Sequence, residues 1–128
     1  MVQVSLARGW DLDIERGPDW LFVRPRRRSA IASQTPRLAE HVWFLLEQNF
    51  TYRLVLEMGD IDCLDSYLIG QLVWLQKQIQ AHEGMIRICG LSSSNQEVLR
   101  ACKLNGYFSP FRDREDAVMG QSRPKHPR

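Results

Sequence analysis

Residues 53–81 read RLVLEMGDIDCLDSYLIGQLVWLQKQIQA and carry the strongest structural pattern of the chain. The apolar run Leu54–Met58 ends at Gly59, which predicts a buried strand followed by a turn. After an acidic loop, apolar residues recur at helical spacing until Gly84, which predicts the end of a helix over residues 66–82. The buried face predicted for this helix consists of Leu68, Leu72, Leu75 and Ile79, with Ile69 and Val73 at its margin.

Asp65 and Ser66 stand where this helix is predicted to begin. Oxygen-bearing side chains are favoured there because the first backbone N–H groups of a helix have no partner within the helix. The helix dipole is positive at this end, so a phosphate on Ser66 would be electrostatically favourable for the helix. Ser66 is therefore a candidate phosphoacceptor, and a purely structural role at the helix start is the alternative.

The segments before this stretch also alternate between strand and helix patterns. Residues 10–15 and 20–25 predict a hairpin, because turn-forming residues separate two β-rich runs. Thr35-Pro36 predicts a helix entry, since proline is favoured at the first helical position. The buried face expected for that helix consists of Leu38, Val42, Leu45, Leu46 and Phe50, and Asn49 is its expected end.

After the central stretch, residues 85–89 predict another core strand. A short helix is expected over residues 96–104, with Val98, Leu99 and Cys102 pointing inward. Phe111 is expected in a short last strand, and residues 115–119 in a last helical turn. Strands that alternate with helices after an initial hairpin predict an α/β domain with a mixed central sheet and covering helices.

Length and composition favour one globular domain. The chain has 128 residues, of which 44% are hydrophobic and 25% charged, and its formal net charge is +2. We divide it into an N-terminal arm over residues 1–9, a domain over residues 10–120 and a basic, disordered tail over residues 121–128. An extra edge strand is the alternative for the arm. The sequence shows neither a membrane-spanning run nor a signal peptide, so we expect a cytoplasmic protein.

Two other features point to surface or core roles and away from binding chemistry. The three cysteines lack metal-site spacing, which favours reduced thiols. The cluster Arg26–Arg28 has no interleaved aromatic residue and no nucleic-acid-binding motif around it. We therefore expect the arginines on a solvated surface and no direct nucleic-acid partner.

Residues 60–75, DIDCLDSYLIGQLVWL, resemble the signature of the STAS domain family, typified by bacterial anti-sigma-factor antagonists. A second match is Leu104-Asn105-Gly106-Tyr107-Phe108, where the family has Leu-x-Gly and an aromatic residue after its third helix. The resemblance covers roughly residues 10–120. It implies a single STAS-like α/β domain, and it implies that Ser66, directly after Asp65, is phosphorylated by a partner kinase.

The resemblance also implies a function and partners. The chain would be a non-enzymatic signalling switch that binds a serine-kinase anti-sigma factor, is reset by a phosphatase, and acts without a cofactor, a metal or membrane insertion. The partner-binding residues expected from it are Asp62, Asp65, Tyr67, Ile69 and Gly70. The alternative is an unphosphorylated STAS scaffold in a larger signalling or transport assembly.

The sequence departs from the family pattern in two places. Tyr67 and Leu68 stand where a second serine and a first glycine are common, while Gly70 matches the second glycine. Tyr67 is large enough either to obstruct a kinase or to anchor a different partner. The Gly-Glu-Leu-Asp pattern that commonly precedes the first helix of the family is absent from this sequence.

Four carboxylates within nine residues leave two other functions open. Glu57, Asp60, Asp62 and Asp65 are compatible with a divalent-metal site or an aspartyl-phosphate receiver. A solvated acidic rim around a partner-binding face is favoured over both, since a strand and a turn spread these side chains in different directions. A hydrolase with Ser66 as nucleophile is disfavoured because no Gly-x-Ser-x-Gly motif is present.

Overall fold

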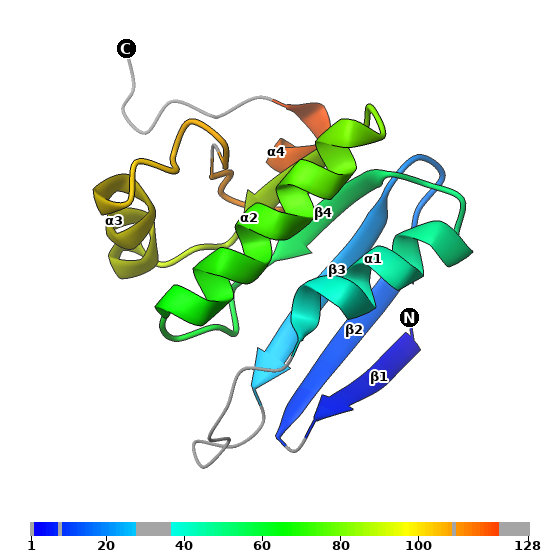
Figure 1. Ribbon diagram of the computed structural model, residues 1–128, viewed down its shortest axis with the longest axis horizontal. Coiled ribbons are helices and arrows are strands. Elements are labelled where there is room, and N and C mark those ends of the chain that lie inside the picture. The colour runs from blue at the N-terminus through cyan, green and yellow to red at the C-terminus, as the bar shows by residue number, and fades with distance from the viewer. Residues whose placement is uncertain (1, 8, 28–36, 109, 121–128) are drawn as a thin grey trace.

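The computed structural model describes residues 2–7, 9–27, 37–108 and 110–120. Five strands form one sheet in the order β1-β2-β3-β4-β5 (Figure 1). Their bounds are β1 Val2–Ala7, β2 Trp10–Arg16, β3 Leu21–Arg27, β4 Arg53–Glu57 and β5 Met85–Cys89. The helices are α1 Leu38–Gln48, α2 Ser66–Ala81, α3 Ser93–Ala101 and α4 Arg114–Met119.

The sheet is mixed, as the sequence predicts. β1, β2 and β3 pair antiparallel, and the β2–β3 hairpin closes with a hydrogen bond from Gly17 N to Trp20 O of 2.8 Å. β3, β4 and β5 pair in parallel, so their carboxyl ends lie at the same edge of the sheet. The predicted hairpin, the two later strands and the long helix are thereby confirmed.

The main core lies between one face of the sheet and the helices α1 and α2 (Figure 1). Alternate strand residues point to this face, because successive side chains of a strand project in opposite directions. The predicted buried face of α2 is confirmed, with Leu68, Leu72, Leu75 and Ile79 all buried. A smaller apolar cluster on the opposite face of the sheet lies under α4 and consists of Trp20, Phe22, Val55, Cys89 and Ala117.

The end of α2 explains Gly84. After the helix, Glu83 adopts a positive φ of 59°, and the Gly84 N–H donates to Ile79 O at 2.9 Å. A Cβ at Gly84 would lie 2.1 Å from the carbonyl oxygen of Tyr52. Glycine is therefore required at position 84, because the backbone of Tyr52, directly before β4, approaches too closely to leave room for a side chain.

Two residues predicted to lie in the core, Phe50 and Cys102, are exposed, so both predictions were wrong. Phe50 is 92% exposed, because it follows the end of α1 with a positive φ of 53° that turns its side chain away from the sheet. Cys102 is the C-cap that follows the last residue of α3, Ala101, and it is exposed. Leu45 and Val98 pack against the core from its margin, whereas Leu99 is fully buried.

The start of the chain forms a strand. Residues 2–7 pair with β2, so this segment forms the extra edge strand that was the alternative expectation for it. The predicted helix entry at Thr35-Pro36, the last residue of the Arg26–Arg28 cluster and the tail over 121–128 lie outside the described residues. Across the described ranges, no helix has the length and apolar character needed to cross a membrane.

Candidate partner-binding site at the start of α2

The loop between β4 and α2 is anchored by its buried side chains and its backbone. Met58 N donates to Cys89 O at 2.9 Å, and Ile61 N donates to Met58 O at 3.1 Å. Ile61 and Leu64 are buried and belong to the main core. The loop therefore leaves the carboxyl end of β4 along a fixed path, and its polar residues are the ones that face solvent.

Asn95, near the start of α3, fixes the same loop from the side. Its side chain is 1% exposed, accepts a hydrogen bond from Leu64 N at 3.1 Å and donates one to Ile61 O at 3.0 Å. Ser92 holds this part of α3, since its hydroxyl oxygen accepts from Asn95 N at 3.1 Å. Two backbone groups of the loop thus depend on one buried amide.

Asp65 is the N-cap of α2. Its φ and ψ of −84° and 171° are extended, and its carboxylate accepts a hydrogen bond from Leu68 N at 2.7 Å. This arrangement satisfies one of the backbone N–H groups that a helix start leaves without a partner. Asp65, which the family resemblance places among the expected partner-binding residues, therefore also stabilises the start of the helix.

Ser66 is the first residue of α2, and its side chain is exposed. Tyr67 is 48% exposed, and Gly70 is exposed one turn further on. A Cβ built on Gly70 would meet no atom within 4 Å, so the helix surface is open at that point. Residues three or four apart share a helix face, which brings Ser66, Tyr67 and Gly70 onto one surface.

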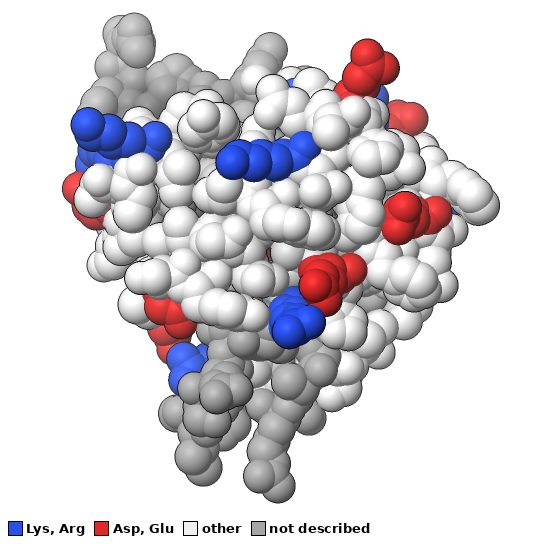
Figure 2. All heavy atoms as spheres, viewed as in Figure 1, with Lys and Arg blue, Asp and Glu red and all other residues white. Residues whose placement is uncertain are grey.

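That surface continues along α2. Trp74 is 39% exposed and lies two turns after Tyr67 on the same side of the helix. We call the surface made by Ser66, Tyr67, Gly70 and Trp74 the exposed α2 face. Lys77 is the only charged residue within α2, and the molecular surface over α1 and α2 shows few charged side chains (Figure 2).

The remaining predicted partner-binding residues differ in their surroundings. Asp62 is exposed in the loop before the helix, close in sequence to Ser66. Ile69 is half-buried and packs against the main core, so only part of its side chain is available to a partner. Asp62 and the exposed α2 face therefore form the accessible part of the site.

The four carboxylates of the central stretch do not converge. Glu57 forms an ion pair with Arg114, with an Oε2 to Nη2 distance of 2.7 Å. Asp60 pairs with Arg24 at 2.6 Å, while Asp65 caps the helix. Among the described residues, no three histidine, cysteine or acidic side chains are placed to hold a metal ion.

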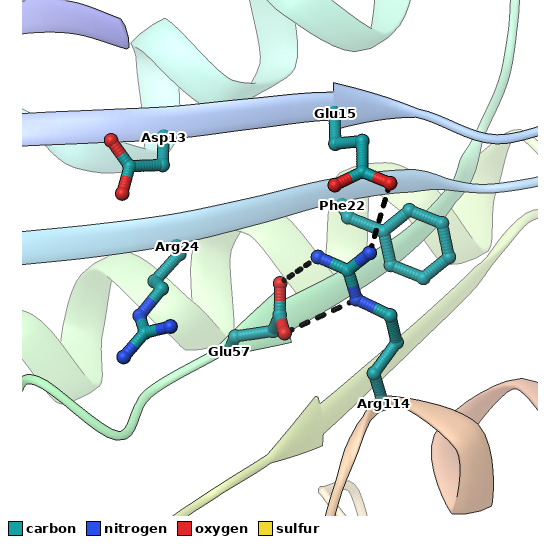
Figure 3. Close-up of a pocket in the computed structure, with 6 residues that line it drawn as sticks. All are labelled: Asp13, Glu15, Phe22, Arg24, Glu57 and Arg114. Carbon is teal, nitrogen blue, oxygen red and sulfur yellow. Dashed lines mark hydrogen bonds and ion pairs between the residues drawn. The ribbon is translucent and has the colours of Figure 1, made fainter. Parts of the chain in front are cut away.

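A small polar hollow lies on the opposite face of the sheet from α2 (Figure 3). Arg114, at the start of α4, contacts Glu57 of β4 and Glu15 of β2 and lies over the ring of Phe22, 4.2 Å from its centre. Asp13 and Arg24 complete the lining. Ion pairs of Arg114 thus connect α4 to β2 and β4, and its contact with the Phe22 ring connects α4 to β3.

Hydrogen bonds and burial shift the pKa values of three side chains on this side of the sheet. The hydrogen bond to Glu57 raises the pKa of Arg114, and the hydrogen bond to Asp60 raises that of Arg24. Burial raises the pKa of the Cys89 thiol to about 12. Cys89 is therefore a protonated core residue, and neither it nor the paired arginines offer reactive groups at neutral pH.

Sequence reasoning missed Asn95 and the Arg114–Glu57 pair. The run Leu91-Ser92-Ser93-Ser94-Asn95 is typical of a loop and a helix cap, and nothing in it indicates that the Asn95 amide contacts residues 61 and 64. The two members of the ion pair are 57 residues apart, and no local pattern links them. Both contacts exist only once the sheet has formed.

In this mixed sheet, a helix that begins with a serine follows the carboxyl end of a parallel strand. The STAS domain model matches residues 16–117. The chain belongs to the STAS family.

Solved structures of other proteins share this fold. The NMR structure of the protein TM1081 is 14% identical, with a TM-score of 0.70, and the match covers 83% of this chain and 84% of that one. A crystal structure of TM1081 from Thermotoga maritima, designated a candidate anti-sigma factor antagonist, is 13% identical, with a TM-score of 0.65 and 85% and 92% coverage.

A further similar structure is Moorella thermoacetica RsbS carrying a serine-to-glutamate substitution. It is 11% identical, with a TM-score of 0.70, and the match covers 85% of this chain and 92% of that one. A comparison with curated protein sequences gives no significant match. At these identities the structural similarity establishes the fold, and the sites must be argued from this chain's own residues.

Proposed function

We propose that this protein is a non-enzymatic signalling switch of the anti-sigma-factor-antagonist type, with Ser66 as its phosphoacceptor. The observation that carries the proposal is the position of Ser66: it is exposed, it is the first residue of α2, and the residues before it are fixed by Asp65 and Asn95. A kinase can reach such a hydroxyl without unfolding the domain. The structural neighbours, which include an anti-sigma-factor-antagonist candidate, support this type of function.

In the proposed mechanism, the unmodified loop and the exposed α2 face bind a serine kinase that also restrains a sigma factor. Binding of the kinase releases the sigma factor for transcription. Phosphorylation then adds about −1.5 to −2 charges beside Asp62 and Asp65. The new charge must lose its water if the partner is to stay bound, so the complex dissociates.

The fold is expected to tolerate the phosphate. Negative charge at a helix start is stabilised by the helix dipole and by backbone N–H groups. The switch therefore acts on the binding surface and leaves the hydrophobic core unchanged. A phosphatase removes the group and restores the binding-competent form, and ATP is bound by the kinase alone. We place the protein in the cytoplasm, where such kinases act.

The second candidate is a STAS scaffold that is never phosphorylated, and the observation that favours it is Tyr67. Tyr67 follows Ser66 directly in the chain, is half-exposed, and is large enough to anchor a partner of a different kind. Tyr67→Ser separates the two functions. If Tyr67 only restricts access of a kinase, the substitution speeds phosphorylation of Ser66, whereas a scaffold loses affinity for its partner.

The first experiment is co-purification of the protein from its native cell, followed by identification of the proteins that bind. The switch predicts a protein with kinase activity that transfers labelled phosphate from ATP to Ser66. Ser66→Ala is the matched control, because it removes the hydroxyl and leaves the helix start otherwise intact. A partner without kinase activity that binds in a Tyr67-dependent manner would support the scaffold instead.

A further inference from the structure

The two edge strands of the sheet, β1 and β5, differ in whether another segment pairs with their outer side. Beyond β5, Phe111 forms a bridge to Cys89, its N–H donates to Ile88 O at 2.9 Å, and its carbonyl oxygen accepts from Gly90 N at 3.2 Å. The outer edge of β1 has no such cover within the described residues, and β1 lies at the rim of the sheet (Figure 1). An open edge strand presents unpaired backbone N–H and C=O groups.

Over Val2–Ser5, β1 lacks the features that usually prevent pairing at an open edge. Its sequence, VQVSLA, contains no charged residue and no proline, whereas each of the other four strands carries at least one charge. Charged residues, prolines and bulges are the usual protection of edge strands. A register shift occurs between Ser5 and Ala7, so Val2–Ser5 is the regular, unprotected part of the edge.

We propose that this edge binds the same edge of a second copy of the chain. A two-fold axis perpendicular to the sheet brings two β1 strands together antiparallel and joins two five-stranded sheets into one continuous sheet. In such pairing, opposite residues share a face, so the axis passes through Gln3 or Val4. With the axis at Gln3, Val2 lies opposite Val4 of the second copy. With the axis at Val4, Gln3 lies opposite Ser5. No pair formed within Val2–Ser5 carries a charge.

Two features of the surroundings favour a second copy as the occupant. Val2 is 61% exposed on the side of the sheet that carries the helices, and the strand of a second copy covers it with another apolar residue. The acidic residues of β2, among which Asp13 pairs with Arg26 and Glu15 with Arg114, lie three strand spacings from their symmetry mates in the dimer. That separation is about 14 Å, well beyond the screening length of about 8 Å at physiological salt.

The dimer leaves the partner-binding site free. β4, which leads into the Ser66 loop, lies three positions away from β1 in the sheet. Because the axis is perpendicular to the sheet, the α2 helices of both copies lie on the same side. The dimer therefore presents two exposed α2 faces, and a dimeric partner would bind it with higher avidity than a monomer.

The test is sedimentation equilibrium over a concentration series from about 5 to about 500 μM, since small interfaces give weak, concentration-dependent dimers. The proposal predicts that the mass of the wild-type protein rises from 14.9 kDa toward twice that value. The double variant Gln3→Lys, Ser5→Lys places like charges directly opposite each other in both registers. The dissociation constant of its dimer should be at least tenfold higher than that of the wild-type dimer.

Two controls keep this result interpretable. Gln48→Lys, Gln80→Lys adds the same charge at exposed helix positions and should dimerise like the wild type. Hydrogen exchange on the wild-type protein, which needs no substitution, should show β1 amides that are better protected at high concentration. A wild-type protein that stays monomeric throughout, or an edge variant that associates as the wild type does, would overturn the proposal.

Discussion

Replacing Asn95 with alanine should destabilise the domain far more than its place in a short surface helix suggests. The change removes the acceptor of the Leu64 N–H and the donor to Ile61 O, both at a side chain that is 1% exposed. A buried polar group left without a partner costs about 1–3 kcal/mol. Two such groups, with partial access of water to the loop, give an expected loss of about 2–4 kcal/mol.

The assay is urea denaturation, compared with Ser94→Ala as a matched control. Ser94 is the neighbouring residue of α3 and is exposed, so its truncation should change the free energy of unfolding by less than about 0.5 kcal/mol. Hydrogen exchange should also show faster exchange of the Leu64 amide in Asn95→Ala. A loss below about 1 kcal/mol, or one equal to that of the control, would refute the claim that this amide holds the loop.

Three further predictions concern the core and the helix ends. Leu72→Asp should cost several kcal/mol by burying an unpaired charge, while Gln76→Asp should be nearly neutral; equal losses in thermal denaturation would contradict the assigned helix face. Because burial raises the pKa of Cys89 to about 12, its thiolate is absent at pH 8, so a thiol reagent should label only the other two cysteines until denaturant is added. Rapid labelling of all three in the native protein would contradict this. Gly84→Ala should destabilise the protein by more than about 2 kcal/mol, because a Cβ there clashes with the Tyr52 carbonyl; a neutral outcome in urea denaturation would show that this turn relaxes freely.

The helix and sheet pattern was largely predictable because it depends on local periodicity. The apolar spacing from Leu68 to Ile79 fixed the buried face of α2, and Asp65 was predicted at its start because helix starts favour oxygen-bearing side chains. Phe50 shows the limit of periodicity: the pattern continues past the helix, but the backbone turns to a positive φ and sends the ring into solvent.

The site was only partly predictable, because its support comes from distant residues. Ser66 and Tyr67 were identified from the helix start and a family pattern, and both are exposed there. The residues that hold the loop and connect α4 to the sheet, Asn95 and Arg114, act over 31 to 57 positions of sequence. Such contacts follow from strand order and register, which one sequence alone does not define in detail.

The most direct test of the proposed switch is the binding of its kinase to three forms of the protein. Ser66→Asp should keep the melting temperature within a few degrees and weaken binding at least tenfold, about 1.4 kcal/mol or more. Ser66→Ala should bind like the unmodified protein and incorporate no labelled phosphate. Equal binding by all three forms, or label on Ser94 or Thr51 in place of Ser66, would contradict the account.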